Sequence, residues 1–232
     1  MSVLFDDPSD PWALILSKYD LGEAAATWPD APSRAEQGTG VALSCPAGSP
    51  AWTALVEAQG FHCPSVLITD QYEAACSFIE STEDLVYLAP HEHEQGGLLL
   101  SREEAKGVVG PWLLRGAVMV AQVPAGCVCS VYLVAGRVVA TVVRGGRSVA
   151  GRVADVGFGA STMERCGGLV RAFGLRFAEV LLSIGSEGKI GCLDVVARPN
   201  YWNCPRDVHR RVVSRLVRSL IDEVPLVAQP MV

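Results

Sequence analysis

Polar side chains that can bind or catalyse stand beside apolar runs in the second half of the chain. The runs 130–144 and 189–199 carry them at or near their ends, and they are Arg144, Asp194, Arg198, Asn200 and Tyr201. An apolar strand has little structural need for so many polar groups, so these five are candidate catalytic residues of one binding site. A purely structural ion pair between Arg198 and Asp194 is an equally good interpretation.

A second group of reactive side chains lies upstream in the motif His91-Glu-His-Glu94, which is followed by Gln95-Gly-Gly97. Imidazole titrates near neutral pH, so His91 and His93 are candidate acids or bases. Two imidazoles and two carboxylates can also hold a metal ion. A loop that is merely kept soluble by its charges is the favoured interpretation, and no metal site is predicted.

Cysteine is unusually frequent, with eight residues in 232. The chain shows no export signal, which favours free thiols over disulfides. Cys127 and Cys129 form the one close pair, and alternation along a strand puts both sulfurs on one face. Because no second cysteine or histidine pair is near in sequence, a zinc site is not expected.

Hydrophobic periodicity predicts the elements that position the candidate residues. Two β-branched runs joined by a turn at Ala135-Gly136 predict a hairpin over 130–144. Ser161-Thr-Met-Glu164 has the form of a capping box, opening a helix that ends at Gly174. Further expected elements are strands in 174–182 and 189–199 and an amphipathic helix over about 206–221.

The first half of the chain has weaker signals. The expected elements there are strands in 60–69, 85–90 and 118–122 and a helix over 70–79. Earlier still, the expected order is a strand at 1–5, a helix at 10–18, a loop at 27–40 and a strand at 41–45.

The order of hairpin, glycine-rich segment, helix, paired strands and terminal helix resembles the nucleotide-binding end of ATP-grasp carboxylate–amine ligases of the peptide-ligase or maturase type. The resemblance implies an α+β fold of two lobes, with antiparallel sheets and flanking helices, preceded by a short α/β segment. It divides the chain into a truncated pre-ATP-grasp-like segment at 1–60, a small lobe at 61–122 and a large lobe at 123–232.

The resemblance also identifies positions where the family's reactive residues are replaced. The lysine that contacts nucleotide phosphate corresponds to Leu88, and the aspartate-x-arginine pair to Val128 and Ser130. A metal-binding carboxylate corresponds to Leu181, and the metal-binding asparagine to Val196. Magnesium requires near-octahedral oxygen coordination, which leucine and valine cannot supply.

At three positions the sequence still resembles the family's nucleotide site. Arg144 matches the phosphate-facing arginine, Asp194 an acidic metal ligand, and Gln122 ends the strand that enters the adenine hinge. Gln122 and Arg144 are therefore the candidate cofactor-binding residues. Phosphoryl transfer rests almost entirely on positioning and charge stabilisation, so the missing groups predict loss of ligase activity.

Two functions follow from this pattern. In the first, the chain is a pseudo-ligase in peptide or small-molecule biosynthesis, either a binding partner or an ATP-independent catalyst, and uses no cofactor. In the alternative it is an active ligase that forms an acyl phosphate with ATP and magnesium, with Glu179 and Glu187 as substitute carboxylates. Whether the chain is an enzyme stays open between them.

Composition narrows the partners. A net charge of -6 argues against nucleic acid, and no apolar stretch is long enough to span a membrane. The short, acidic amino terminus does not resemble a signal peptide, so a cytoplasmic location is expected. Positive mean hydropathy suggests apolar surface that a homodimer would cover. The expected partner is a peptide, a small-molecule substrate or a protein.

The arginines of 206–221 are interpreted as the solvated face of the terminal helix. Binding of an acidic partner to these arginines is the alternative.

Overall fold

The computed structural model describes residues 47–83, 85–91, 97–144, 158–185, 188–197, 199 and 204–223. The elements expected before residue 46 lie outside the described residues, and of the short α/β segment at 1–60 only residues 47–60 are described. The division at residues 60 and 122 stays a prediction.

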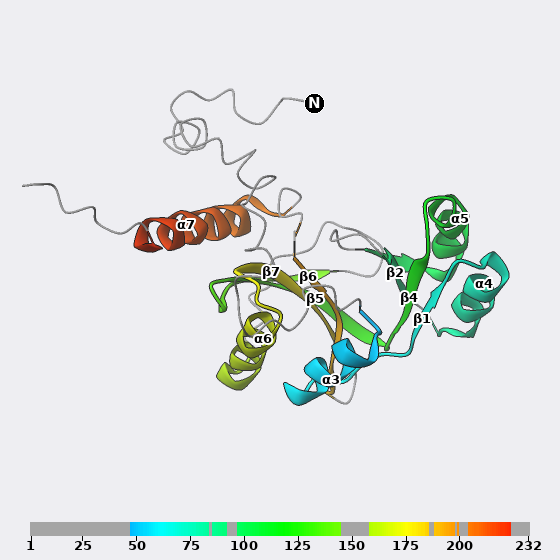
Figure 1. Cartoon of the computed structure of the whole chain (residues 1–232), viewed down its shortest axis with the longest axis horizontal. Coiled ribbons are helices and arrows are strands. Elements are labelled where there is room, and N and C mark those ends of the chain that lie inside the picture. The colour runs from blue at the N-terminus through cyan, green and yellow to red at the C-terminus, as the bar shows by residue number, and fades with distance from the viewer. Residues whose placement is uncertain are drawn as a thin grey trace, which may run out of the picture. The chain divides into compact units, whose positions relative to one another are not determined.

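The first sheet is antiparallel and has the strand order β1-β4-β2-β3. Its strands are β1 (Val66–Thr69), β2 (Leu85–Pro90), β3 (Leu98–Ser101) and β4 (Val118–Val123). Helices α4 (Tyr72–Ser81) and α5 (Arg102–Leu113) cover one face of this sheet (Figure 1). Ile79, Leu88 and Val109 are among the buried residues that fill the space between helices and sheet.

The second sheet is also antiparallel and has the order β6-β5-β7-β8. Its strands are β5 (Gly126–Val134), β6 (Arg137–Arg144), β7 (Phe177–Gly185) and β8 (Ile190–Val196). One face packs on α6 (Ala160–Ala172) and α3 (Pro50–Ala58), with Trp52, Leu169 and Val180 in the shared core. The predicted hairpin and the predicted paired strands therefore share one sheet, which confirms the expected α+β architecture.

The hairpin turn forms where the sequence predicts it. Ala135 and Gly136 join β5 to β6 and have φ angles of 50° and 70°. Positive φ at both central residues is the mark of a type I′ turn, whose twist matches that of the flanking strands. Gly136 adopts this conformation without strain, and Ala135 does so at some steric cost.

The start of α6 differs from the expectation. Gly159 is the N-cap, and its carbonyl oxygen already accepts hydrogen bonds from the backbone N–H groups of Thr162 and Met163. Ser161 therefore lies inside the first turn, and the capping box predicted at Ser161 is wrong. The helix ends as predicted, with Gly174 at a φ of 69°.

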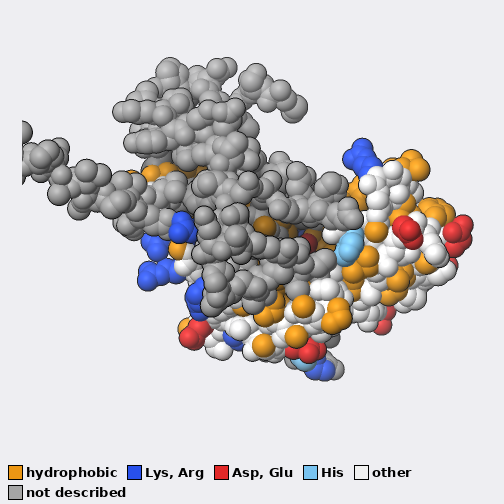
Figure 2. Space-filling view, in the orientation of Figure 1, with side chains coloured by type: hydrophobic (Ala, Val, Ile, Leu, Met, Phe, Trp, Pro, Cys, Tyr) orange, Lys and Arg blue, Asp and Glu red, His pale blue; other side chains and the backbone are white. Residues whose placement is uncertain are grey.

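The terminal helix α7 (Arg206–Glu223) packs against β5 and β6. Val208, Val212 and Val213 are buried, as the amphipathic pattern predicts, whereas Arg206, Arg210 and Arg218 are exposed. On the face shown in Figure 2, basic side chains gather beside α7 and acidic ones around α4 and α5. No helix in the described part of the chain is long and apolar enough to cross a bilayer.

A third core joins the two sheets, and we call it the interface cluster. It consists of Tyr87, Ala89, Met119, Ala121 and Val123 from the first sheet and Val128, Leu181 and Leu193 from the second. Leu193 projects from an irregularity in β8, because Leu181 pairs with Asp194 while Leu182 pairs with Cys192. The face of the second sheet opposite α6 is thus turned toward the first sheet.

Candidate functional site

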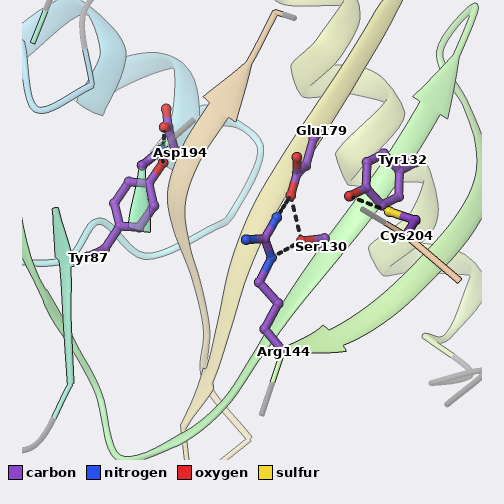
Figure 3. A network of polar contacts seen from close by, with 8 residues as sticks. Tyr87, Ser130, Tyr132, Arg144, Glu179, Asp194 and Cys204 are labelled. Carbon is purple, nitrogen blue, oxygen red and sulfur yellow. Dashed lines mark hydrogen bonds and ion pairs between the residues drawn. The ribbon is translucent and has the colours of Figure 1, made fainter. Parts of the chain in front are cut away.

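Polar side chains interrupt the apolar surface next to the interface cluster (Figure 3). Ser130 and Tyr132 follow Val128 at alternating positions of β5, so all three lie on one face. Cross-strand pairing places Glu179 opposite Tyr132, and Arg144 opposite Val128. We call the group the polar cluster; its members are Tyr87, Ser130, Tyr132, Arg144, Glu179, Asp194 and Cys204.

Arg144 is held by two partners. Its Nε donates to Ser130 Oγ at 2.5 Å, and a second guanidinium nitrogen donates to Glu179 Oε1 in an ion pair. Ser130 Oγ in turn donates to Glu179 Oε1 at 2.5 Å. Burial is the largest single effect on the pKa of Arg144 and lowers it, but the charge and hydrogen bond of Glu179, together with Tyr132 and Tyr87, raise it more, so the net pKa is raised. The three side chains form a closed, charge-neutral group.

Asp194 is held by neutral donors. Tyr87 Oη donates to Asp194 Oδ2 at 2.5 Å, and the Val195 backbone N–H donates to Oδ1 at 2.8 Å. Burial raises the pKa of Asp194 to about 6, although both hydrogen bonds act in the opposite direction. Tyr87 also accepts a hydrogen bond from the Gly97 N–H at 2.6 Å, and burial raises its pKa well above the ordinary value. Tyr87 therefore links the two sheets and the segment that precedes β3.

Tyr132 and Cys204 form the outer part of the polar cluster. The Cys204 thiol donates to Tyr132 Oη at 3.1 Å. Burial is the main cause that raises the pKa of each group, and the negative charge of Glu179 adds to it. A thiol with a raised pKa is a poor nucleophile near neutral pH. In the described residues no group of three or more His, Cys, Asp or Glu side chains is placed to hold a metal ion.

Two of the predicted site residues, Arg144 and Asp194, meet in the polar cluster. Gln122 lies in β4 opposite Val86, on the face shared with Val120 that α4 and α5 cover, so it points away from the polar cluster. His91 follows β2, and its backbone N–H donates to Ala117 O at 3.0 Å. The catalytic and cofactor roles of these residues stay predictions. His93, Arg198, Asn200 and Tyr201 lie outside the described residues.

The structure corrects one of the positions that the resemblance identified. Leu88 is fully buried against α4 and α5, whereas its neighbours Tyr87 and Ala89 belong to the interface cluster. A lysine reaching a ligand between the sheets would have to stand at position 87 or 89. The assignment to Leu88 is therefore off by one residue, because the apolar run 85–90 does not reveal which alternate positions face the site. Neither Tyr87 nor Ala89 carries a positive charge.

Two residues of the polar cluster, Tyr87 and Tyr132, were not among the predicted site residues, although the sequence contains a signal for them. Tyr87 and Tyr132 are hydroxyl-bearing side chains inside otherwise apolar strands, and Tyr132 stands two residues from Ser130. A polar atom inside a buried strand requires a hydrogen-bond partner. Pairing the polar positions of the two neighbouring strands predicts that Tyr132, Ser130 and Glu179 lie close together.

This arrangement of sheets and helices is the ATP-grasp fold, as the sequence resemblance implied. The ligase PsnB in complex with a minimal precursor is similar over 75% of this chain and 58% of that one, with 19% identity and a TM-score of 0.51. PsnB with precursor peptide PsnA2 and AMPPNP is similar over 92% of this chain and 71% of that one, with 18% identity and a TM-score of 0.53.

A further PsnB structure, with a phosphomimetic variant of the minimal precursor, Mg and ADP, has 19% identity and a TM-score of 0.53. It is covered over 57% of its length, and this chain over 75%. The chain thus matches little more than half of the ligase in two of these comparisons. No protein-family model matches the sequence, and no curated protein matches it either.

Proposed function

We propose that the chain is an ATP-grasp-like pseudo-ligase, which acts by binding a peptide or a partner protein and does not catalyse ATP-dependent ligation. The observation that carries the proposal is the state of Arg144, the residue that resembles the family's phosphate-facing arginine. Its guanidinium is bound to Glu179 and Ser130 within the protein itself. The cation that a nucleotide would need is therefore already neutralised.

The contacts of the two carboxylates support the proposed loss of Mg-ATP binding. Asp194 accepts hydrogen bonds from Tyr87 and Val195, and Glu179 accepts them from Arg144 and Ser130, so each carboxylate already has protein partners. Val128 and Leu181 fill neighbouring positions with apolar side chains. Arg144 is the one cation of the polar cluster and is already paired. Each charge-assisted hydrogen bond that the phosphates thereby lose weakens binding by roughly 1.5–3 kcal/mol.

A peptide is the ligand class that we favour. Solved PsnB complexes contain a precursor peptide, and the similarity of fold to these complexes supports a peptide ligand. Peptide biosynthesis is therefore the proposed setting. The cytoplasmic location and the homodimer expected from composition belong to the same proposal.

Calorimetric titration with Mg-ATP tests the loss of nucleotide chemistry. We expect no saturable binding up to millimolar nucleotide and no ADP release in the presence of the PsnA2 precursor peptide as a probe. Arg144→Ala should leave both results unchanged. Micromolar Mg-ATP binding that disappears in Arg144→Ala would revive the active ligase that uses Asp194 and Glu179, and would overturn the pseudo-ligase.

A further inference from the structure

The ion pair between Arg144 and Glu179 is enclosed very unequally. The Glu179 side chain is 5% exposed, whereas the Arg144 side chain is 31% exposed. The carboxylate thus lies beneath the guanidinium, between β5 and β7, and part of the guanidinium remains open to solvent. A dissolved anion can therefore reach the exposed part of Arg144.

Charge opposes that approach. Glu179 is a covalently attached anion that loses no translational freedom on pairing, unlike a dissolved anion. Displacing it would leave a buried carboxylate without its cation, which is strongly unfavourable. Binding beside it would place a second anion next to Glu179 and near Asp194, whose pKa the charge of Glu179 already helps to raise. The obstacle to an external anion is therefore electrostatic.

We infer that Glu179 is an internal counter-ion that closes an anion-binding site at Arg144, and that neutralising this one side chain opens the site to phosphate-containing ligands. The inference rests on the proposed function, because it identifies how this chain excludes nucleotide from the position of the phosphate-facing arginine. Glu179 acts on ligand binding through Arg144 and is a specificity-determining residue.

Glu179→Gln is the informative variant. Glutamine has the same shape, and its amide oxygen can still accept the hydrogen bonds of Arg144 and Ser130, while the guanidinium keeps its full positive charge. Pyrophosphate is the probe, and its affinity is measured by calorimetry at pH 7.5. We expect Glu179→Gln to bind pyrophosphate about 10- to 100-fold more tightly than the wild type, the gain of one charge-assisted contact.

Two controls separate this effect from a general change in charge. Glu164→Gln removes an exposed carboxylate on α6 and alters the net charge equally, so it should leave pyrophosphate affinity unchanged. Adding Arg144→Gln to Glu179→Gln should abolish the gain. A folded Glu179→Gln protein that binds pyrophosphate no better than the wild type, or a gain that survives the loss of Arg144, overturns the inference.

A measurement on the wild type covers the case in which Glu179→Gln does not fold. The Nε–H resonance of Arg144, assigned by its absence in Arg144→Lys, should not shift when pyrophosphate is added to about 1 mM, a concentration that half-fills a site with a Kd of about 1 mM. A saturable shift would show that Glu179 does not close the site, and would overturn the inference.

The outcomes for this inference and for the pseudo-ligase differ. Ligase activity in the wild type that survives Arg144→Ala, together with tighter pyrophosphate binding by Glu179→Gln, overturns the proposed function only. Absence of Mg-ATP binding in the wild type, together with no gain in Glu179→Gln, overturns the inference only.

Discussion

The two carboxylates of the polar cluster show how partners determine the cost of a buried charge. Glu179 is 4% exposed and has a guanidinium as its partner, so its negative charge is compensated. Among the described residues, the Asp194 carboxylate accepts hydrogen bonds only from neutral groups, the Tyr87 hydroxyl and the Val195 N–H. Neutral donors do not offset the loss of water, and the pKa of Asp194 rises to about 6.

The raised pKa of Asp194 makes stability depend on pH. The folded protein holds this proton more tightly than the unfolded chain, whose pKa is near 3.8. The contribution of Asp194 to stability is therefore full below about pH 4 and is lost as pH rises through 6. Asp194→Asn should abolish this loss, which amounts to as much as about 3 kcal/mol at 1.36 kcal/mol per pKa unit.

Urea denaturation of the wild type and Asp194→Asn between pH 4 and 7.5 measures this effect. The difference between the two unfolding free energies cancels the titration of all other groups. It should change in favour of Asp194→Asn as pH rises, with its midpoint between pH 4 and 6. A difference that is constant with pH, or that changes in the opposite direction, contradicts the prediction.

Single residues were predictable from the sequence where their chemistry conflicts with their surroundings. Arg144 and Asp194 are charged groups at the ends of apolar runs, which is why they could be singled out. The hydroxyl of Tyr87 inside an apolar run is a weaker signal than a charge, because tyrosine is also a common residue of strands. The continuous apolar run of β2 further concealed which positions face the second sheet, since a strand buried on both faces does not alternate.

At the scale of elements, the capping box that the structure forms at Ser101 differs in its backbone from the one that the sequence predicted at Ser161. Ser101 is the N-cap of α5, where its hydroxyl accepts the Glu104 N–H and its own N–H donates to Glu104 Oε2 at 2.8 Å. Ser161 is already helical. Ser101→Ala should therefore lower the unfolding free energy by about 1 kcal/mol, because the serine hydroxyl no longer accepts the Glu104 N–H or donates to the Glu104 carboxylate.

The matched substitution Ser161→Ala serves as the control. Alanine has a higher helix propensity than serine, so this variant should be neutral or slightly stabilising, within about 0.5 kcal/mol. Urea denaturation of both variants checks the pair. An equal loss in the two variants would show that Ser161 also caps its helix.

Two helical glycines should respond oppositely to alanine. Gly107 in α5 has open space where a Cβ would stand, so Gly107→Ala should stabilise the protein by about 0.5–1 kcal/mol through helix propensity. A Cβ on Gly167 in α6 would lie 2.4 Å from the carbonyl oxygen of Gly136. Gly167→Ala should therefore destabilise the protein by about 1–3 kcal/mol, because helix and hairpin must separate.

Thermal denaturation of the two alanine variants gives the sign directly. Since both changes add the same methyl group to a helix, propensity cancels in their comparison. Stabilisation by Gly167→Ala would mean that the close approach of α6 to the β5–β6 turn is not present in solution.

The elements that the sequence predicted are those with strong periodicity or turn chemistry. The hairpin, the paired strands β7 and β8, and the terminal helix meet this condition. Helix α5 does not, because Gly107, Gly110 and Pro111 are residues that disfavour a helix. Its capping box at Ser101 and Glu104 was the available signal, and packing on the first sheet stabilises what propensity does not.

At the scale of the whole molecule, the two sheets depend on a shared core to different degrees. Thirteen buried residues form the core between the second sheet and its helices, and eight form the core of the first sheet, among the described residues. The smaller core relies more on the interface cluster for its stability, since less apolar surface is buried within it. The Tyr87–Asp194 hydrogen bond adds to the same interface.

This difference predicts which sheet opens first when the interface is weakened. Leu193 is fully buried in the interface cluster, and Leu193→Ala should cost about 2–5 kcal/mol through lost contacts and the cavity left behind. Hydrogen exchange should accelerate more in β2 and β4 than in β5 and β7. Leu169→Ala on α6, an equally buried residue of the second sheet's own core, is the matched control and should accelerate exchange mainly in β5 and β7. If both variants accelerate exchange in both sheets equally, the sheets unfold as one cooperative unit and neither opens separately.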